Sequence, residues 1–69
     1  MLENIMKIYV ITYTLNQFNE IQVETSLKKA VDFILEHLCE GDTPLLEIWE
    51  ESERVRTLEY EEVLRLKLR

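Results

Sequence analysis

The chain has 69 residues, which is enough for one small domain, and includes one glycine and one proline. Its single cysteine excludes an internal disulfide. A lone core in a chain this short contributes only about 3 to 5 kcal/mol, so natural domains of this size often add a metal or a partner chain. The net charge of −6 argues against direct nucleic-acid binding, because phosphate contacts need Lys or Arg. We therefore expect a single domain over residues 1–69 that self-associates.

The charge is unevenly distributed along the chain. Residues 1–53 contain eleven acidic residues against three lysines, whereas residues 54–69 contain five basic residues against three glutamates. The basic end is therefore expected to pair with the acidic body of its own chain or of a neighbour, or simply to be solvated.

The only long apolar run, IMKIYVITYTL over residues 5–15, is too short to span a bilayer. Glu3 precedes it where a secretory signal would be basic, and no small-residue cleavage site follows. A single thiol suits a reducing compartment. The sequence thus predicts a cytoplasmic protein without membrane contact.

The first hairpin is predicted over residues 6–24. Residues 6–15 are β-branched, aromatic and apolar on both alternating faces, which is typical of a strand covered on both sides. A polar turn follows at residues 16–19. Residues 20–24 then alternate, with Ile21 and Val23 expected to point inward, as in an edge strand paired with the first.

The clearest element is a helix predicted over residues 26–40. Its apolar residues recur at spacings of three and four, so they share one face. Thr25 or Ser26 suits the N-cap, and Gly41 follows where a left-handed C-terminal residue is favoured, with Pro44 beyond it. The apolar stripe consists of Leu27, Ala30, Val31, Ile34 and Leu38, widened by Phe33 and Leu35.

Two further strands are predicted at residues 45–51 and 54–58, joined by a short turn that lacks the usual hairpin glycine. Residues 59–69 favour a short helix, because glutamates precede basic residues as the helix dipole prefers; an alternating strand is the other interpretation. The pattern ββαββ predicts an α+β domain with a four-stranded antiparallel sheet of order 2-1-3-4, one helix on one face and the C-terminal segment as a short helix.

No residues are predicted to be catalytic, cofactor-binding or metal-binding. His37 and Cys39 are two positions apart on a helix and so point in different directions, which rules out a dyad or joint metal ligation. The glutamates at 47, 50, 51 and 53 lack the pattern of a calcium loop, and one glycine cannot form a phosphate loop. We therefore do not expect an enzyme.

The aromatic residues are the best candidates for an interface. If Ile8, Val10, Leu46 and Ile48 face the helix, strand parity sends a second set of side chains to the uncovered face of the sheet. Two alternatives remain, in which the C-terminal segment covers this set or the set itself lies beneath the helix. The predicted interface residues are Tyr9, Ile11, Tyr13 and Trp49.

Two functions fit these features. The first is a small acidic protein-interaction module, homodimeric and able to bind another protein through the aromatic face or a strand edge. The alternative is an inhibitor that imitates the charge of nucleic acid and binds the basic site of a nucleic-acid-binding protein. Its acidic rows would be Glu20, Glu24, Glu47, Glu50, Glu51 and Glu53.

Overall fold

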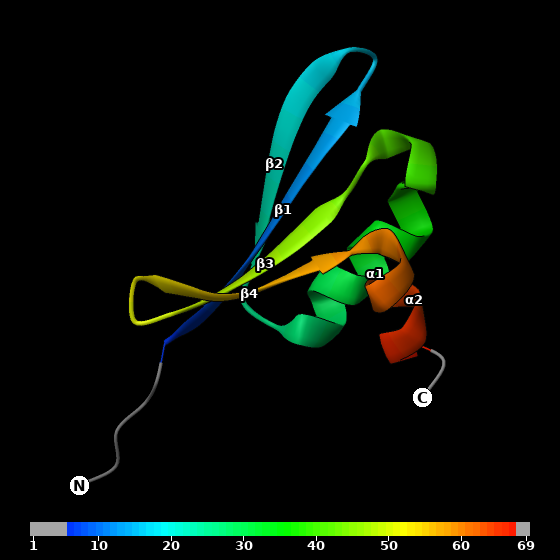
Figure 1. Ribbon diagram of the computed structural model, residues 1–69. Coiled ribbons are helices and arrows are strands. Elements are labelled where there is room, and N and C mark those ends of the chain that lie inside the picture. Colours follow the sequence, from blue (N-terminus) through cyan, green and yellow to red (C-terminus); the bar gives the residue numbers. More distant parts are fainter. Residues whose placement is uncertain (1–5, 68–69) are drawn as a thin grey trace, which may run out of the picture.

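The computed structural model describes residues 6–67, which form a twisted sheet with two helices against it (Figure 1). The elements in chain order are β1 (Lys7–Leu15), β2 (Phe18–Glu24), α1 (Leu27–His37), the short 3₁₀ helix η1 (Glu40–Asp42), β3 (Leu45–Glu50), β4 (Glu53–Glu59) and α2 (Tyr60–Lys67). All neighbouring strands are antiparallel, in the order β2-β1-β3-β4. The predicted α+β class, the strand order and the C-terminal helix are confirmed.

Both helices pack on the same face of the sheet, as Figure 1 shows. The core between the layers joins the apolar stripe of α1 to residues from β1, β3, β4 and α2, and Val63 of α2 is as buried as the strand residues, at 1% exposure. α2 is therefore part of the domain core. The buried apolar residues are Tyr9, Ile11, Ala30, Val31, Ile34, Leu38, Leu46, Leu58 and Val63.

The N-terminus of α1 follows the prediction, but its C-terminus does not. Ser26 is extended, and its hydroxyl accepts a hydrogen bond from the backbone N–H of Lys29 at 3.1 Å. The helix ends at His37, because Leu38 adopts an extended conformation and its side chain is buried in the core. The expected cap at Gly41 is wrong: Gly41 lies in η1 without a positive φ, and Thr43 is the left-handed residue instead.

The start of α2 is held by its own sequence. The side chain of Glu62 accepts a hydrogen bond from the backbone N–H of Glu59 at 3.0 Å, just before the first turn. Acidic Glu61 and Glu62 occupy that turn, and Arg65 and Lys67 occupy the last. This arrangement matches the helix dipole, which explains why the segment is helical despite its alternating leucines.

Both hairpins turn through residues that are not glycine. Asn16 and Gln17 have φ of 51° and 71°, and Glu51 and Ser52 have φ of 52° and 70°. Two successive residues with positive φ form a turn whose twist matches that of the two paired strands. The sequence Asn-Gly is the one most favoured in such turns. The sequence had placed the second turn one residue later, at Ser52 and Glu53, because no glycine marks its position.

The core position of Ile34 leads to a first prediction. Its side chain is fully buried, so Ile34→Asp would place an unpaired carboxylate among apolar groups and should unfold the domain. The control Glu36→Asp introduces the same residue at an exposed position of the same helix, and should change the thermal midpoint only slightly. Circular dichroism of both variants measures the outcome; a folded Ile34→Asp protein with an unchanged midpoint would contradict the core assignment.

The turn geometry leads to a second prediction. Gln17→Gly removes the side chain from a residue with φ of 71°, and should stabilise the fold by about 0.5 to 1 kcal/mol, a rise of several degrees in thermal midpoint. Asn19→Gly, two residues later within β2, should instead destabilise the fold by a similar amount. If both glycines lower the midpoint equally, Gln17 is not under backbone strain.

Candidate interaction face

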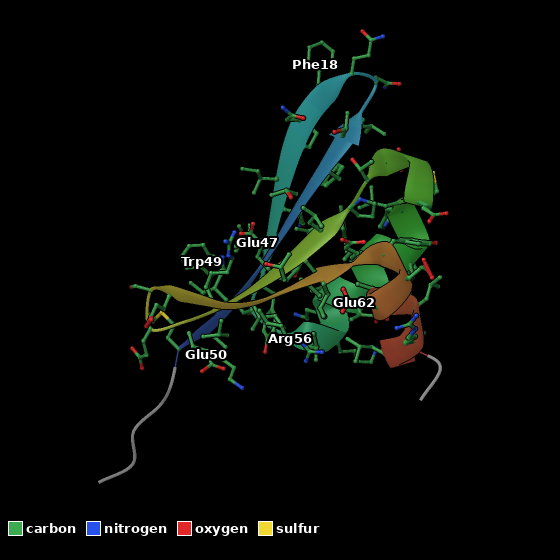
Figure 2. All side chains as sticks on the ribbon, in the orientation of Figure 1. Phe18, Glu47, Trp49, Glu50, Arg56 and Glu62 are labelled. Carbon is green, nitrogen blue, oxygen red and sulfur yellow. The ribbon has the colours of Figure 1, made fainter. Side chains whose placement is uncertain are left out.

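The side of the sheet opposite the two helices is called here the open face. Cross-strand pairs define it, because directly paired residues project to the same side of a sheet: Trp49 pairs with Ile8, Glu47 pairs with Val10, and Val10 pairs with Val23. In Figure 2, Trp49 and Glu47 extend away from the side on which the helices lie. The open face comprises Ile8, Val10 and Thr12 of β1, Ile21 and Val23 of β2, Leu45, Glu47 and Trp49 of β3, and Thr57 of β4.

The structure separates the four predicted interface residues. Tyr9 and Ile11 are buried beneath the helices at 8% and 0% exposure, and the ring of Tyr13 lies 5.8 Å from that of Phe33 in α1. Trp49 alone lies on the open face. The prediction that all four share an uncovered face is therefore wrong, and for the three β1 residues the stated alternative, a position on the helix-covered side, is the one observed.

The physical reason is the register between β1 and β3. Tyr9 pairs with Ile48 and Ile11 pairs with Leu46, so odd-numbered residues of β1 share a face with even-numbered residues of β3. The prediction that Leu46 and Ile48 lie under the helix is correct, but the same prediction placed Ile8 and Val10 on that face with them. A change of one residue in register exchanges the two faces of a strand, and the sequence of β1 does not reveal that choice.

The prediction for the edge strand β2 is wrong about the side that its apolar residues face. Ile21 and Val23 were expected to point inward, yet they lie on the open face with exposures of 67% and 54%. The intervening polar side chains project to the helix side. The regular alternation of apolar and polar residues in β2 shows that one face of this strand is apolar. It does not show which face the helices cover. Those polar residues are Glu20, Gln22 and Glu24.

Trp49 is held in place by polar neighbours on the same face. Its indole Nε1 donates a hydrogen bond to Oε1 of Glu47 at 3.0 Å, and Nη1 of Arg54 lies 3.4 Å from Oε2 of the same carboxylate. The carboxylate is thus shared between an indole and a guanidinium, which fixes the ring orientation. A fixed aromatic side chain loses little conformational entropy when a partner covers it.

A hollow of about 400 Å³ lies beside Trp49 on the open face. Its walls are mainly apolar, and the β3–β4 turn forms one rim. The hollow gives this face relief, so that it is not a flat sheet surface. It is lined by Met6, Ile8, Val10, Trp49, Glu51 and Ser52.

The fold places the six glutamates of the predicted acidic rows on different parts of the surface. Glu47 is paired with Arg54 on the open face, and Glu50 lies 3.6 Å from Nζ of Lys7. Glu20 and Glu24 project to the helix side from the edge strand β2, which β1 separates from β3. Within the described chain, the six glutamates therefore do not line up as one surface.

His37 and Cys39 occupy separate environments. The imidazole of His37 stacks at a tilt on Phe33, with ring centroids 5.1 Å apart. Cys39 lies after the helix end, exposed, with its Sγ 3.5 Å from Oδ2 of Asp42. Residues 6–67 contain no group of three His, Cys, Asp or Glu side chains arranged to hold a metal ion.

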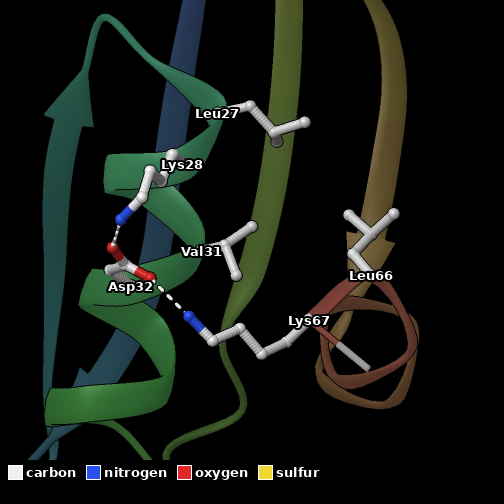
Figure 3. Close-up of a pocket in the computed structure, with 6 residues that line it drawn as sticks. All are labelled: Leu27, Lys28, Val31, Asp32, Leu66 and Lys67. Carbon is white, nitrogen blue, oxygen red and sulfur yellow. Dashed lines mark hydrogen bonds and ion pairs between the residues drawn. The ribbon is translucent and has the colours of Figure 1, made fainter. Parts of the chain in front are cut away.

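A second hollow, of about 280 Å³, lies between α1 and α2 (Figure 3). Asp32 accepts hydrogen bonds from Nζ of Lys28 at 2.8 Å and from Nζ of Lys67 at 3.1 Å, and so connects the two helices. These bonds lower the pKa of Asp32 below its usual 3.8 and raise the pKa of Lys28 above its usual 10.5. Leu27, Val31 and Leu66 form the apolar part of this hollow.

Comparison with protein families, curated proteins and solved structures finds no match to this chain. Within residues 6–67, none of the helices has the length and apolar character needed to cross a membrane.

The shared carboxylate of Asp32 leads to a third prediction, on pH. Because the folded state lowers the pKa of Asp32, the carboxylate stabilises the fold above the unfolded-state pKa near 3.8, and this contribution is lost as the pH falls through the folded value. The difference in thermal midpoint between the wild type and Asp32→Asn should be largest near neutral pH and vanish in strong acid. Added salt should also reduce it, because the pair is exposed.

Glu20→Gln is the control for this titration, since Glu20 forms none of the ion pairs found in the described part of the chain. It should show a smaller midpoint difference at neutral pH. A midpoint difference for Asp32→Asn that is independent of pH would show that the carboxylate does not connect the helices in solution.

Proposed function

We propose that this protein is a small protein-interaction module, acting by binding and not by catalysis, whose open face contacts another polypeptide and which self-associates as a homodimer through that face. The main support is a sheet face that carries Ile21, Val23 and a hydrogen-bonded Trp49 without cover from either helix. Contiguous apolar patches that contain aromatic residues are enriched at protein interfaces.

The composition of β1 supports the same proposal. Its two alternating faces are both apolar, which is typical of a strand covered on both sides, yet the helices cover only the face of Tyr9 and Ile11. Ile8 and Val10 on the other face are half-buried by their neighbours in the sheet. A partner chain would provide the second layer.

The energetic scale indicates weak affinity. Full burial of an exposed Val or Ile contributes about 1.5 to 3 kcal/mol, so covering the exposed parts of Ile21 and Val23 in two copies contributes roughly 4 to 6 kcal/mol. Burial of Trp49 adds to this, but association costs about 4 to 15 kcal/mol in lost freedom, so gain and cost largely offset one another. We therefore expect a weak dimer, with a dissociation constant no tighter than roughly 100 μM.

We also propose that the protein acts in the cytoplasm. Its single cysteine, Cys39, is exposed, and an exposed thiol persists most readily in a reducing compartment. Inhibition by imitation of nucleic-acid charge has less support, because Arg54 and Lys7 pair with two of the required glutamates.

The interface generates a fourth prediction. Trp49→Glu should shift the protein from dimer to monomer in sedimentation velocity at several hundred micromolar, because it places a charge at the centre of the open face. Since Trp49 is the only tryptophan, the fluorescence of the wild type reports the same event: its emission should shift to the red on dilution through the dissociation constant.

Two further variants make this test specific. Glu at position 49 would also repel Glu47, so Ile21→Lys provides a second disruption at an exposed edge position that the monomer tolerates. Phe18→Glu is the matched control, because Phe18 is 68% exposed at the tip of the β1–β2 hairpin, away from the open face (Figure 2). It should leave the dimer intact.

A wild-type protein that stays monomeric at several hundred micromolar would exclude the homodimer. Salt distinguishes the two functions: the apolar association should change little between low and high ionic strength, whereas binding of a basic partner to acidic rows should weaken strongly.

A further inference from the structure

The open face carries a ridge and a hollow side by side. The ridge consists of Ile21 and Val23 on β2, which are the most exposed apolar side chains in the paired strands of this face. The hollow lies beside Trp49, over the neighbouring strands β1 and β3 and toward the β3–β4 turn. A convex apolar ridge and a concave apolar hollow on the same surface allow two copies of that surface to fit each other.

We infer that the partner on the open face is a second copy of this chain, packed sheet against sheet so that the ridge of each copy enters the hollow beside Trp49 of the other. This inference rests on the proposed function and specifies its partner and geometry. Val23 pairs with Val10, whereas Trp49 pairs with Ile8, two residues further along the strands. A two-fold axis must therefore cross β1 at roughly 45° to place Val23 of one copy opposite the hollow beside Trp49 of the other. The contact then occurs twice, as a two-fold interface requires.

The charge distribution leaves the open face as the surface through which a second copy can approach. Two copies that each carry a net charge of −6 repel one another over most of their surfaces. The centre of the open face is neutral, because Glu47 and Arg54 compensate each other there. A second acidic chain can therefore approach through this face without strong repulsion.

The size of the face is close to what a small interface needs. Four strands spaced about 4.8 Å apart and six residues long cover on the order of 400 Å² in projection per copy. Two copies together give roughly 800 Å² before side-chain relief is counted, just below the roughly 1,000 Å² that marks a specific interface. An axis inclined at roughly 45° to the strands makes the two sheets cross at a large angle, as in the orthogonal class of sheet packing.

Nuclear magnetic resonance of a mixed dimer tests this geometry with the wild-type protein. Within one chain β1 separates β2 from β3, and Val23 and Trp49 are also two residues out of step along the strands, so their backbones lie roughly 12 Å apart. In a sample of isotope-labelled and unlabelled copies, a filtered experiment records only contacts between copies. We expect contacts between the indole protons of Trp49 in one copy and the methyl groups of Ile21 or Val23 in the other.

A matched pair of variants provides an independent readout. Val23→Lys should weaken dimerisation at least tenfold, because it places an ammonium group in the hollow of the partner. Gln22→Lys lies one residue away but projects to the helix side, where Gln22 now donates a hydrogen bond to Glu24, and it should change the dissociation constant less than about twofold.

The possible outcomes separate this inference from the proposed function. A dimer whose filtered contacts join β2 to β2, or that Val23→Lys does not weaken, would overturn the ridge-and-hollow arrangement and leave an interaction module with another geometry. A protein without any dimer would overturn the homodimer itself. Contacts from Trp49 to Ile21 or Val23, together with the selective loss for Val23→Lys, support both.

Discussion

The register of β1 against β3 decides the position of every other part of this domain. By pairing Ile11 with Leu46, it gives α1 and α2 one continuous apolar floor, and by pairing Ile8 with Trp49 it assembles the open face. β1 itself accepts either choice, because both of its faces are apolar. β3 does not: a shift of its faces would bury the carboxylate of Glu47 beneath the helices, at a cost of several kcal/mol without a partner. The polarity of β3 therefore orients the sheet.

This division of roles explains what could be predicted from the sequence. The stripe of α1, its Ser26 cap, the strand order and the helix at residues 60–67 each follow from local periodicity, cap chemistry or short connections. The face of β1 does not, because Tyr9 and Ile8 are equally suited to burial and only a pairing distant in sequence distinguishes them. Helix ends and turns without glycine were misplaced for a related reason: Leu38 and Ser52 adopt conformations that tertiary packing and strand pairing impose.

The candidate site was predicted only in part. Trp49 was identified because it is aromatic and because strand parity placed it on the face opposite Leu46 and Ile48. Ile21 and Val23 were assigned to the interior, since an alternating edge strand normally directs its apolar side chains toward the covered face. Here the alternation points the other way, toward the uncovered face. The departure of β2 from the usual orientation is itself the feature that distinguishes the open face from ordinary surface.

The position of Val63 in the core has a consequence for folding. Leu46 and Leu58 lie under the helix layer that α2 completes, so the sheet made by residues 7–59 has incomplete cover on its inner side until α2 has packed against it. While α2 is detached, apolar strand residues are exposed on both faces of the sheet, a condition in which partly folded chains aggregate. The docking of one short helix therefore covers one of these two apolar surfaces and leaves the open face exposed.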